Sequence, residues 1–199
     1  MVLARLFETR GQGFYVDVGA HHPTRFSNTR RFYELGWHGI NIEPNPDAFA
    51  LFQRQRNRDT NVCCGVADAE GRMEYFMFNE PALNSFDRSL SESRQNGRYQ
   101  IVARKGVPVR RLSSILEEFL PPRTPIAFMS VDVEGYDLEV LKSNDWMRFR
   151  PEFLLVESVG FELANPGDNP IHVFLSQKGY KIFAKTVHTL FYRDENAPD

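Results

Sequence analysis

Short, continuous apolar runs alternate along the chain with segments whose apolar residues recur at helical spacing. The runs predicted as strands are residues 14–19, 38–43, 61–67, 126–133 and 153–157, with an edge-like strand at 72–78 and a hairpin at 180–185 and 189–192. Helices are predicted at residues 27–35 and 137–143 and after Asn45, Ser114 and Asn169. Strands separated by helices are typical of βαβ units. We therefore expect one doubly wound α/β domain over residues 1–199, with a mainly parallel sheet and an antiparallel C-terminal edge.

Several of these helices carry boundary signals. Asn45-Pro46 and Asn169-Pro170 each combine a good N-cap with a proline suited to the first turn. Ser114 stands three residues before Glu117, which is the spacing of a capping box. Gly36 is placed to end the helix before it.

The periodicity fails between residues 79 and 106, where the chain is polar and rich in turn-forming residues. We interpret this stretch as an insertion or lid, because lids and specificity loops are commonly irregular. Ser85 is a candidate substrate contact, and Arg88, Arg94 and Arg98 could meet an acidic acceptor. A mobile surface loop with solvated arginines explains the same pattern.

Composition and charge exclude some classes of protein. The 24 basic and 26 acidic side chains give a net charge of −2 with no long basic run, so nucleic-acid binding is not expected. No apolar stretch is long enough to cross a bilayer. Cys63 and Cys64 are adjacent, where a disulfide would be strained, so a reducing cytoplasm is the expected compartment.

Carboxylates follow five predicted strands, at the place where an open α/β sheet binds its ligands. A single exposed charge would be unremarkable there, but a cluster of five strand ends repels itself unless something compensates it. The residues are Asp17, Glu43, Asp68, Asp132 with Glu134, and Glu157.

The first of these turns suits a nucleoside better than a dinucleotide. A dinucleotide site needs G-x-G-x-x-G, whereas this turn has Gly19 followed by Ala20, His21, His22 and a proline. A nucleoside without phosphates needs one glycine for close approach and an acid on the second strand for the ribose hydroxyls. Gly19 and Glu43 supply that pair, and S-adenosylmethionine is such a ligand.

Three segments together resemble the FkbM-type methyltransferases. They are D-V-G-A-H-H-P at residues 17–23, G-W-H-G-I-N-I-E-P at 36–44 and S-V-D-V-E-G-Y-D-L-E-V-L-K at 130–142, with V-P-V-R-R-L-S-S-I-L at 107–116 between them. The resemblance covers residues 14–158. It implies a seven-stranded Rossmann-like fold, S-adenosylmethionine as the methyl donor, and O-methylation of a sugar or natural-product hydroxyl. A small-molecule or saccharide acceptor is then the expected partner.

The strand-end residues receive provisional roles. Candidate catalytic residues are Asp132 and Glu134, which share one face of a strand, and His21 and His22, which titrate near neutrality. The predicted donor-binding residues are Asp17, Gly19, Ala20, His21, Glu43, Asn45, Asp68 and Asp132. Glu157 is a second candidate substrate contact. For each histidine, bonding to the local backbone is an equally good explanation.

Other functions stay open at this point. Asp132, Glu134 and Glu157 form an oxygen-rich set suited to Mg²⁺, which would support either a metal-assisted methyltransferase or a metal-dependent hydrolase with His21 and His22. A non-catalytic nucleoside-binding module is a third hypothesis. Because the chain begins close to its first predicted strand, it is also interpreted as one domain of a larger glycan-synthesis protein.

Overall fold

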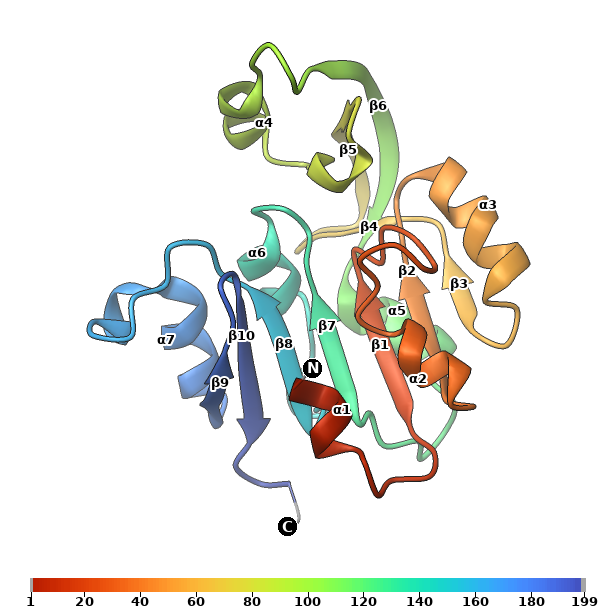
Figure 1. Ribbon diagram of the computed structural model, residues 1–199, viewed down its shortest axis with the longest axis vertical. Coiled ribbons are helices and arrows are strands. Elements are labelled where there is room, and N and C mark those ends of the chain that lie inside the picture. The colour runs from red at the N-terminus through yellow and green to blue at the C-terminus, as the bar shows by residue number, and fades with distance from the viewer. Residues whose placement is uncertain (1, 198–199) are drawn as a thin grey trace.

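A seven-stranded sheet forms the centre of the protein in the computed structural model, which describes residues 2–197 (Figure 1). Its strand order is β3-β2-β1-β7-β8-β10-β9. The strands are β1 (Phe14–Val18), β2 (His38–Ile42), β3 (Thr60–Val62), β7 (Phe128–Val131), β8 (Phe153–Glu157), β9 (Tyr180–Lys185) and β10 (Thr189–Asp194). The first five are parallel to one another, and β10 is antiparallel to both β8 and β9. The predicted mainly parallel sheet with an antiparallel C-terminal edge is confirmed.

Helices cover both faces of this sheet. They are α1 (Val2–Leu6), α2 (Arg30–Glu34), α3 (Pro46–Gln55), α5 (Leu112–Phe119), α6 (Asp137–Lys142) and α7 (Pro170–Gln177). Apolar residues of α5, α6 and α7 pack with β1, β2, β7 and β8 in one core cluster, while α1 and α2 pack on the other face around an aromatic group. That group contains Phe32 and Trp37. None of the described helices is both long and apolar enough to span a bilayer.

Two of the predicted N-caps are present and one is not. The Asn45 side chain accepts from the Asp47 N–H at 3.1 Å, and the Asn169 side chain accepts from the His172 N–H at 2.9 Å. The Ser114 prediction is wrong, because α5 already begins at Leu112 and has no side-chain cap of its own. Instead, the Ser143 hydroxyl at the end of α6 accepts from the Leu112 N–H at 3.0 Å. A tertiary contact therefore replaces the local capping box.

The expected insertion is more regular than the sequence pattern suggests. Residues 79–106 are part of a longer insertion, residues 65–110, which contains β4 (Gly65–Val66), β5 (Gly71–Phe78), β6 (Ile101–Arg110), a short 3₁₀ turn η1 (Pro81–Leu83) and α4 (Arg88–Arg94). The strands form a second sheet in the order β4-β6-β5, so residues 72–78 are not an edge of the main sheet. The prediction of an irregular stretch over residues 79–106 is wrong for α4 and for the first half of β6.

This insertion stands over the carboxyl ends of the parallel strands (Figure 1). The strand order reverses between β1 and β7, because the chain passes from β1 to β2 on one side and returns to β7 on the other. Ligands of open α/β sheets bind at such a reversal. The fold thus places the insertion directly above the expected binding position.

Candidate active site

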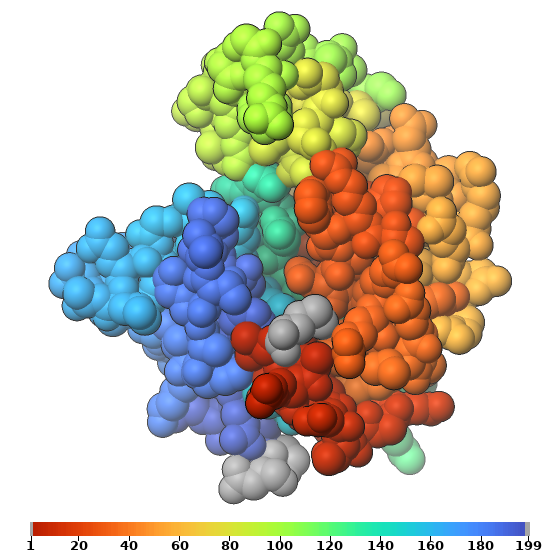
Figure 2. Space-filling model, viewed as in Figure 1, coloured from red at the N-terminus to blue at the C-terminus, as the bar shows by residue number. Residues whose placement is uncertain are grey.

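A cavity of about 240 Å³ lies between the carboxyl ends of the central strands and the insertion. Its walls come from the turn after β1, the end of β2, the β3–β4 connection, the segment after β7 and the insertion itself. Of the predicted site residues, it brings together Asp17, Gly19, Ala20, His21, Glu43, Asn45, Asp132 and Glu134. Figure 2 shows the insertion meeting the segment after β1, where Arg25 and Glu80 form an ion pair at 2.8 Å.

Gly19 lets the turn after β1 press against the segment after β7. Its φ is +76°, and a Cβ built on it would lie 1.9 Å from the carbonyl oxygen of Asp132. The N–H groups of Gly19 and Ala20 both donate to the Ile42 carbonyl, at 3.0 and 3.1 Å. No side chain fits at this position, because both the backbone conformation and the available space require glycine.

Glu43 is buried and held rigidly by two backbone groups. One carboxylate oxygen accepts from the Asn45 N–H and the other from the His21 N–H, each at 2.8 Å. Burial raises the pKa of Glu43 to about 7, although these two hydrogen bonds oppose the rise. Each oxygen keeps a free lone pair, so the fixed carboxylate can accept hydrogen bonds from a vicinal diol in the cavity.

The two adjacent histidines have different surroundings. The Nε2 atom of His21 is buried and has no hydrogen-bond partner among the described residues, and its ring borders the cavity. His21 also has a φ of +56°, a strained conformation of the kind that clusters at functional sites. Burial and the cation of Arg25 lower its pKa, so the imidazole is neutral near pH 7. His21 is therefore the histidine with a free nitrogen for a ligand.

His22 instead braces the loop. Its Nδ1 accepts hydrogen bonds from the N–H groups of Thr24 and Arg25, at 3.1 and 3.0 Å. The cavity walls do not include His22. The structure thus gives this residue the contacts expected from the alternative in which the imidazole bonds to the local backbone.

The insertion supplies an apolar wall to the cavity. The rings of Tyr75 and Phe86 pack with their centroids 4.7 Å apart, and Phe86 lies so close to Gly65 that a Cβ there would be 2.3 Å from its ring. Val66 and Ile42 complete the apolar end. Such a slot between flat rings and aliphatic side chains suits a planar, largely apolar group.

Ser85 holds the insertion in place and is not exposed to the cavity. It is fully buried, its hydroxyl donates to the Glu134 carbonyl at 2.7 Å, and its backbone forms an isolated bridge with Phe76. The prediction of Ser85 as a substrate contact is therefore not supported by its position, because its hydroxyl is already used within the protein.

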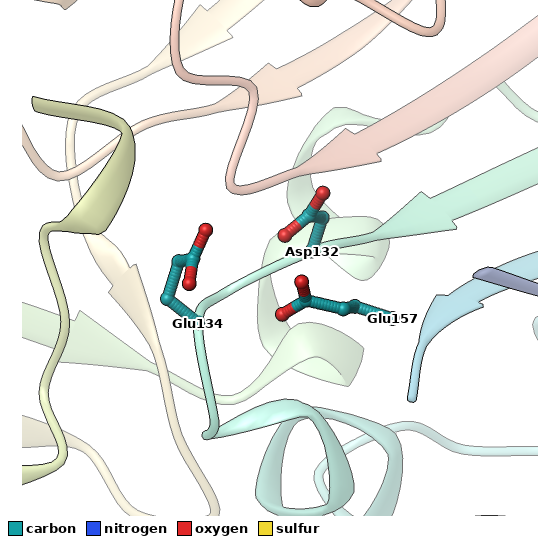
Figure 3. A group of neighbouring side chains, drawn as sticks. All are labelled: Asp132, Glu134 and Glu157. Atoms are coloured by element: carbon teal, nitrogen blue, oxygen red, sulfur yellow. The ribbon is translucent and has the colours of Figure 1, made fainter. Parts of the chain in front are cut away.

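Three carboxylates converge beside the cavity, below α4. Oxygen atoms of Asp132, Glu134 and Glu157 all lie within 4.8 Å of one another (Figure 3). Arg94 of α4 forms an ion pair with Glu134 at 2.6 Å, and Glu134 has a strained φ of +56°. The all-oxygen set remains a predicted site for a divalent cation. Without one, Arg94 is the positive charge that compensates the cluster in the structure.

Mutual repulsion and burial keep this cluster partly protonated. Burial and the Glu134 and Asp17 carboxylates raise the pKa of Asp132 to about 7. Burial and the carboxylates of Asp132, Glu134 and Asp137 raise the pKa of Glu157 to about 8. Asp132 is open to water on one side, even though protein atoms enclose the rest of its side chain. A carboxylate that is accessible and titrates near neutrality is suited to general-base chemistry.

Comparison with known proteins identifies the family. The family model described as a methyltransferase FkbM domain matches residues 17–182. The chain belongs to the FkbM methyltransferase family. Among curated proteins, Methyltransferase sdnD from Sordaria araneosa is 27% identical over 199 residues, an alignment covering 85% of this chain and 74% of that protein. The resemblance carried by the three sequence motifs is thus confirmed.

A solved structure supports the same fold. The crystal structure of methyltransferase FkbM from Methylobacillus flagellatus KT superposes with a TM-score of 0.52 and 14% sequence identity. The match covers 92% of this chain but 44% of that protein, so this FkbM-family chain spans less than half of its length. At this identity the likeness bears on the fold alone.

Besides His22 and Ser85, two more predicted residues lie outside the cavity walls of this FkbM-family protein. Asp68 is half exposed and pairs with Arg111 at 2.9 Å, so the structure does not bring it to the donor site. The reason is that the predicted third strand divides at Cys63 and Cys64, and Asp68 follows β4 of the second sheet. Glu157 approaches only the carboxylate cluster.

Sequence reasoning missed other residues of the site. Tyr75 and Phe86 line the cavity but appear in the sequence as an edge strand and a surface loop. Phe26 also lines it, with 74% of its surface exposed and a φ of +57°. An exposed aromatic residue in a loop, such as Phe26, has no sequence signature. Tyr75 and Phe86 can be recognised as cavity residues only when the position of the insertion over the sheet is known.

Proposed function

We propose that this protein is an S-adenosylmethionine-dependent O-methyltransferase that acts on a hydroxyl group, of a sugar in a glycan or of a glycosylated natural product. The observation that carries this proposal is the pairing of Gly19 and Glu43 in one cavity. A glycine without room for a side chain lines the same cavity as a buried carboxylate that two backbone N–H groups hold in place. Family membership supports the reaction class.

The cavity offers a distinct surface to each part of the donor. Glu43 would accept hydrogen bonds from the two ribose hydroxyls, and the slot beside Tyr75 and Phe86 would hold the adenine. The amino-acid end would lie at the other side of Gly19, where Asp17 and the neutral His21 border the cavity. Carboxylates there complement an ammonium group, whereas a phosphate would be repelled.

The reaction needs little from the protein besides alignment and a base. The donor supplies a methyl group activated by its sulfonium, and the acceptor oxygen displaces the thioether in line. Asp132 would remove the hydroxyl proton, since its pKa of about 7 allows the ionised form near neutral pH. In that role Asp132 would take the proton of the acceptor hydroxyl while the methyl group passes from the donor sulfur to the acceptor oxygen.

The polar surroundings of Asp132 support a hydroxyl-rich acceptor. Carboxylate oxygens of Glu134 and Glu157 lie beside it, and such groups accept hydrogen bonds from the vicinal hydroxyls of a sugar. An acidic acceptor would be repelled by the same cluster, in which one arginine compensates three carboxylates. A neutral saccharide therefore fits this site better than an anionic one.

The proposal is tested by following a labelled methyl group. The protein is incubated with S-adenosylmethionine that carries a labelled methyl group. The acceptors are a panel of methyl glycosides, which offer hydroxyl groups, and sugar acids, which also offer a carboxylate. We expect the label in products that survive mild base, as ethers do, and a rate at least about a hundredfold lower for Asp132→Asn, which cannot remove the proton. Label found only in base-labile esters would overturn the proposed O-methylation, and equal rates for both proteins would overturn the role of Asp132 as the base.

A further inference from the structure

A buried ion pair lies beneath the turn that follows β1. Arg56, at the C-terminal end of α3, has a side chain only 2% exposed, and its Nε donates to Asp59 Oδ2 at 3.0 Å. Neither residue lines the cavity. Two ions removed from water cost free energy unless their hydrogen-bonding groups are satisfied, and apolar packing would often serve stability as well. Stability alone therefore does not explain why this buried ion pair is present.

Asp59 anchors the pair to the sheet. Its carboxylate accepts hydrogen bonds from the Tyr15 hydroxyl at 2.7 Å, the Gly39 N–H at 3.0 Å and the Asn41 side chain at 2.9 Å. Tyr15 belongs to β1, and Gly39 and Asn41 belong to β2. Asp59 is thus fixed to β1 and β2, which gives Arg56 a rigid base.

The other nitrogens of Arg56 reach toward the donor site. Nη1 donates to the Pro23 carbonyl at 3.1 Å, at the end of the turn that carries Gly19 and His21. Nη2 donates to the Thr29 hydroxyl at 2.7 Å, and that hydroxyl donates to Asp17 at 2.8 Å. One planar guanidinium therefore fixes both the backbone of the turn and, through one hydroxyl, a carboxylate that lines the cavity.

We propose that Arg56 is a positioning residue for the methyl donor, which aligns Asp17 through Thr29 and holds the turn through Pro23 so that both receive the donor's amino-acid end. This inference rests on the proposed function, because it concerns how the same cavity binds the donor. It assigns a role to a residue that never touches the ligand. The fork geometry is essential, since a lysine at this position has one nitrogen and cannot reach Asp59, Pro23 and Thr29 together.

The test separates the amino-acid end of the donor from its nucleoside. Titration calorimetry is run with S-adenosylhomocysteine, which has that end, and with 5′-methylthioadenosine, which lacks it. The variants are Arg56→Lys, which keeps the charge, and Thr29→Val, which removes only the linking hydroxyl. The matched control is Arg150→Lys, because Arg150 also forms a two-pronged ion pair, with Asp194, outside the cavity walls. Thermal unfolding of each variant is recorded alongside.

We expect both variants to bind S-adenosylhomocysteine about tenfold more weakly than the native protein, with 5′-methylthioadenosine affected by less than about twofold. The Arg150→Lys control should bind both ligands as the native protein does. If Arg56→Lys does not fold, Thr29→Val decides the outcome, since it leaves the ion pair intact.

Other results would overturn the inference. If both ligands weaken equally, Arg56 acts through general stability, and if neither weakens, the network is irrelevant to binding. In both cases the native protein still binds S-adenosylhomocysteine and the proposed function stands. If the native protein binds neither ligand, the proposed function fails and this inference fails with it.

Discussion

Gly19 and Asp132 come together where the turn after β1 meets the segment after β7, and they show how single residues determine the shape of the site. The Asp132 carbonyl occupies the space where any other residue at position 19 would place its Cβ. The Asp132 side chain is at the same time the accessible member of the carboxylate cluster. Substitutions at these two positions therefore test packing and charge separately.

Gly19→Ala should disrupt both folding and donor binding. The added Cβ would lie 1.9 Å from a backbone oxygen, and the φ of +76° is unfavourable for alanine, so we expect a loss of about 2 kcal/mol or more in the free energy of unfolding. Gly11→Ala is the control, because nothing lies within 4 Å of a Cβ at that position. Urea denaturation measures the difference. A Gly19→Ala protein with native stability and donor affinity would contradict the proposed turn.

The raised pKa of Asp132 predicts a pH dependence of stability. The folded protein binds a proton at Asp132 more tightly than the unfolded chain does, since the pKa rises from 3.8 to about 7. The contribution of Asp132 to the free energy of unfolding is therefore fully present below pH 4 and is lost as the pH rises toward 7.

Asp132→Asn should remove this part of the pH dependence. We expect native protein to lose about 1 kcal/mol more than the variant between pH 4.5 and 7.5, a value reduced for the solvent exposure of the side chain. Asp68→Asn serves as the control, because its carboxylate is half exposed and pairs with Arg111. Denaturant unfolding at the two pH values gives the result. Identical pH profiles for native protein and Asp132→Asn would contradict the raised pKa.

At the scale of elements, α5 shows how tertiary contacts override local signals. Ser114 and Glu117 have the spacing of a capping box, yet the first N–H of α5 is satisfied by Ser143 from the end of α6. The Ser143 hydroxyl also donates to the Val140 carbonyl at 2.7 Å, so it links the ends of two helices. This link joins the helix after β6 to the helix after β7.

Ser143→Ala should therefore cost more stability than Ser114→Ala. Losing a buried cap that accepts and donates costs about 1–2 kcal/mol. The half-buried Ser114 hydroxyl lies outside the cap and bonds to the exposed Glu70, so its loss costs less than about 0.5 kcal/mol. Urea denaturation of the two variants compares the values directly. Equal losses, or a larger loss for Ser114→Ala, would show that the local capping box is the stronger signal.

At the scale of the whole molecule, the main sheet was predictable and the insertion was not. Continuous apolar runs identified β1, β2, β7, β8 and the C-terminal hairpin, because buried strands leave a clear pattern. The pattern fails in β6, where Arg104, Lys105, Gly106 and Pro108 interrupt it, although pairing with β5 and β4 still forms a strand. The short helices α1 and α4 have too few turns to show a period.

The candidate site likewise has one part that could be predicted from the sequence and one part that could not. Its half on the main sheet was predictable from strand ends, which identified Gly19, Glu43 and Asp132 as cavity residues. The half that comes from the insertion depends on contacts between segments far apart in sequence. The pair of Arg56 and Asp59 was also missed, because charged residues near a helix end are usually solvated and only the fold shows that these are buried.

The central claim is that this cavity binds S-adenosylmethionine through Glu43. Titration calorimetry with S-adenosylhomocysteine, run for native protein and for Glu43→Ala, tests it most directly. Glu152→Ala is the control, since Glu152 pairs with Arg10 away from the cavity. We expect clear binding by native protein and control, and a loss of about 2–3 kcal/mol, or some tens of fold in affinity, for Glu43→Ala. Absence of binding by folded native protein, or equal affinity for Glu43→Ala, would contradict the account.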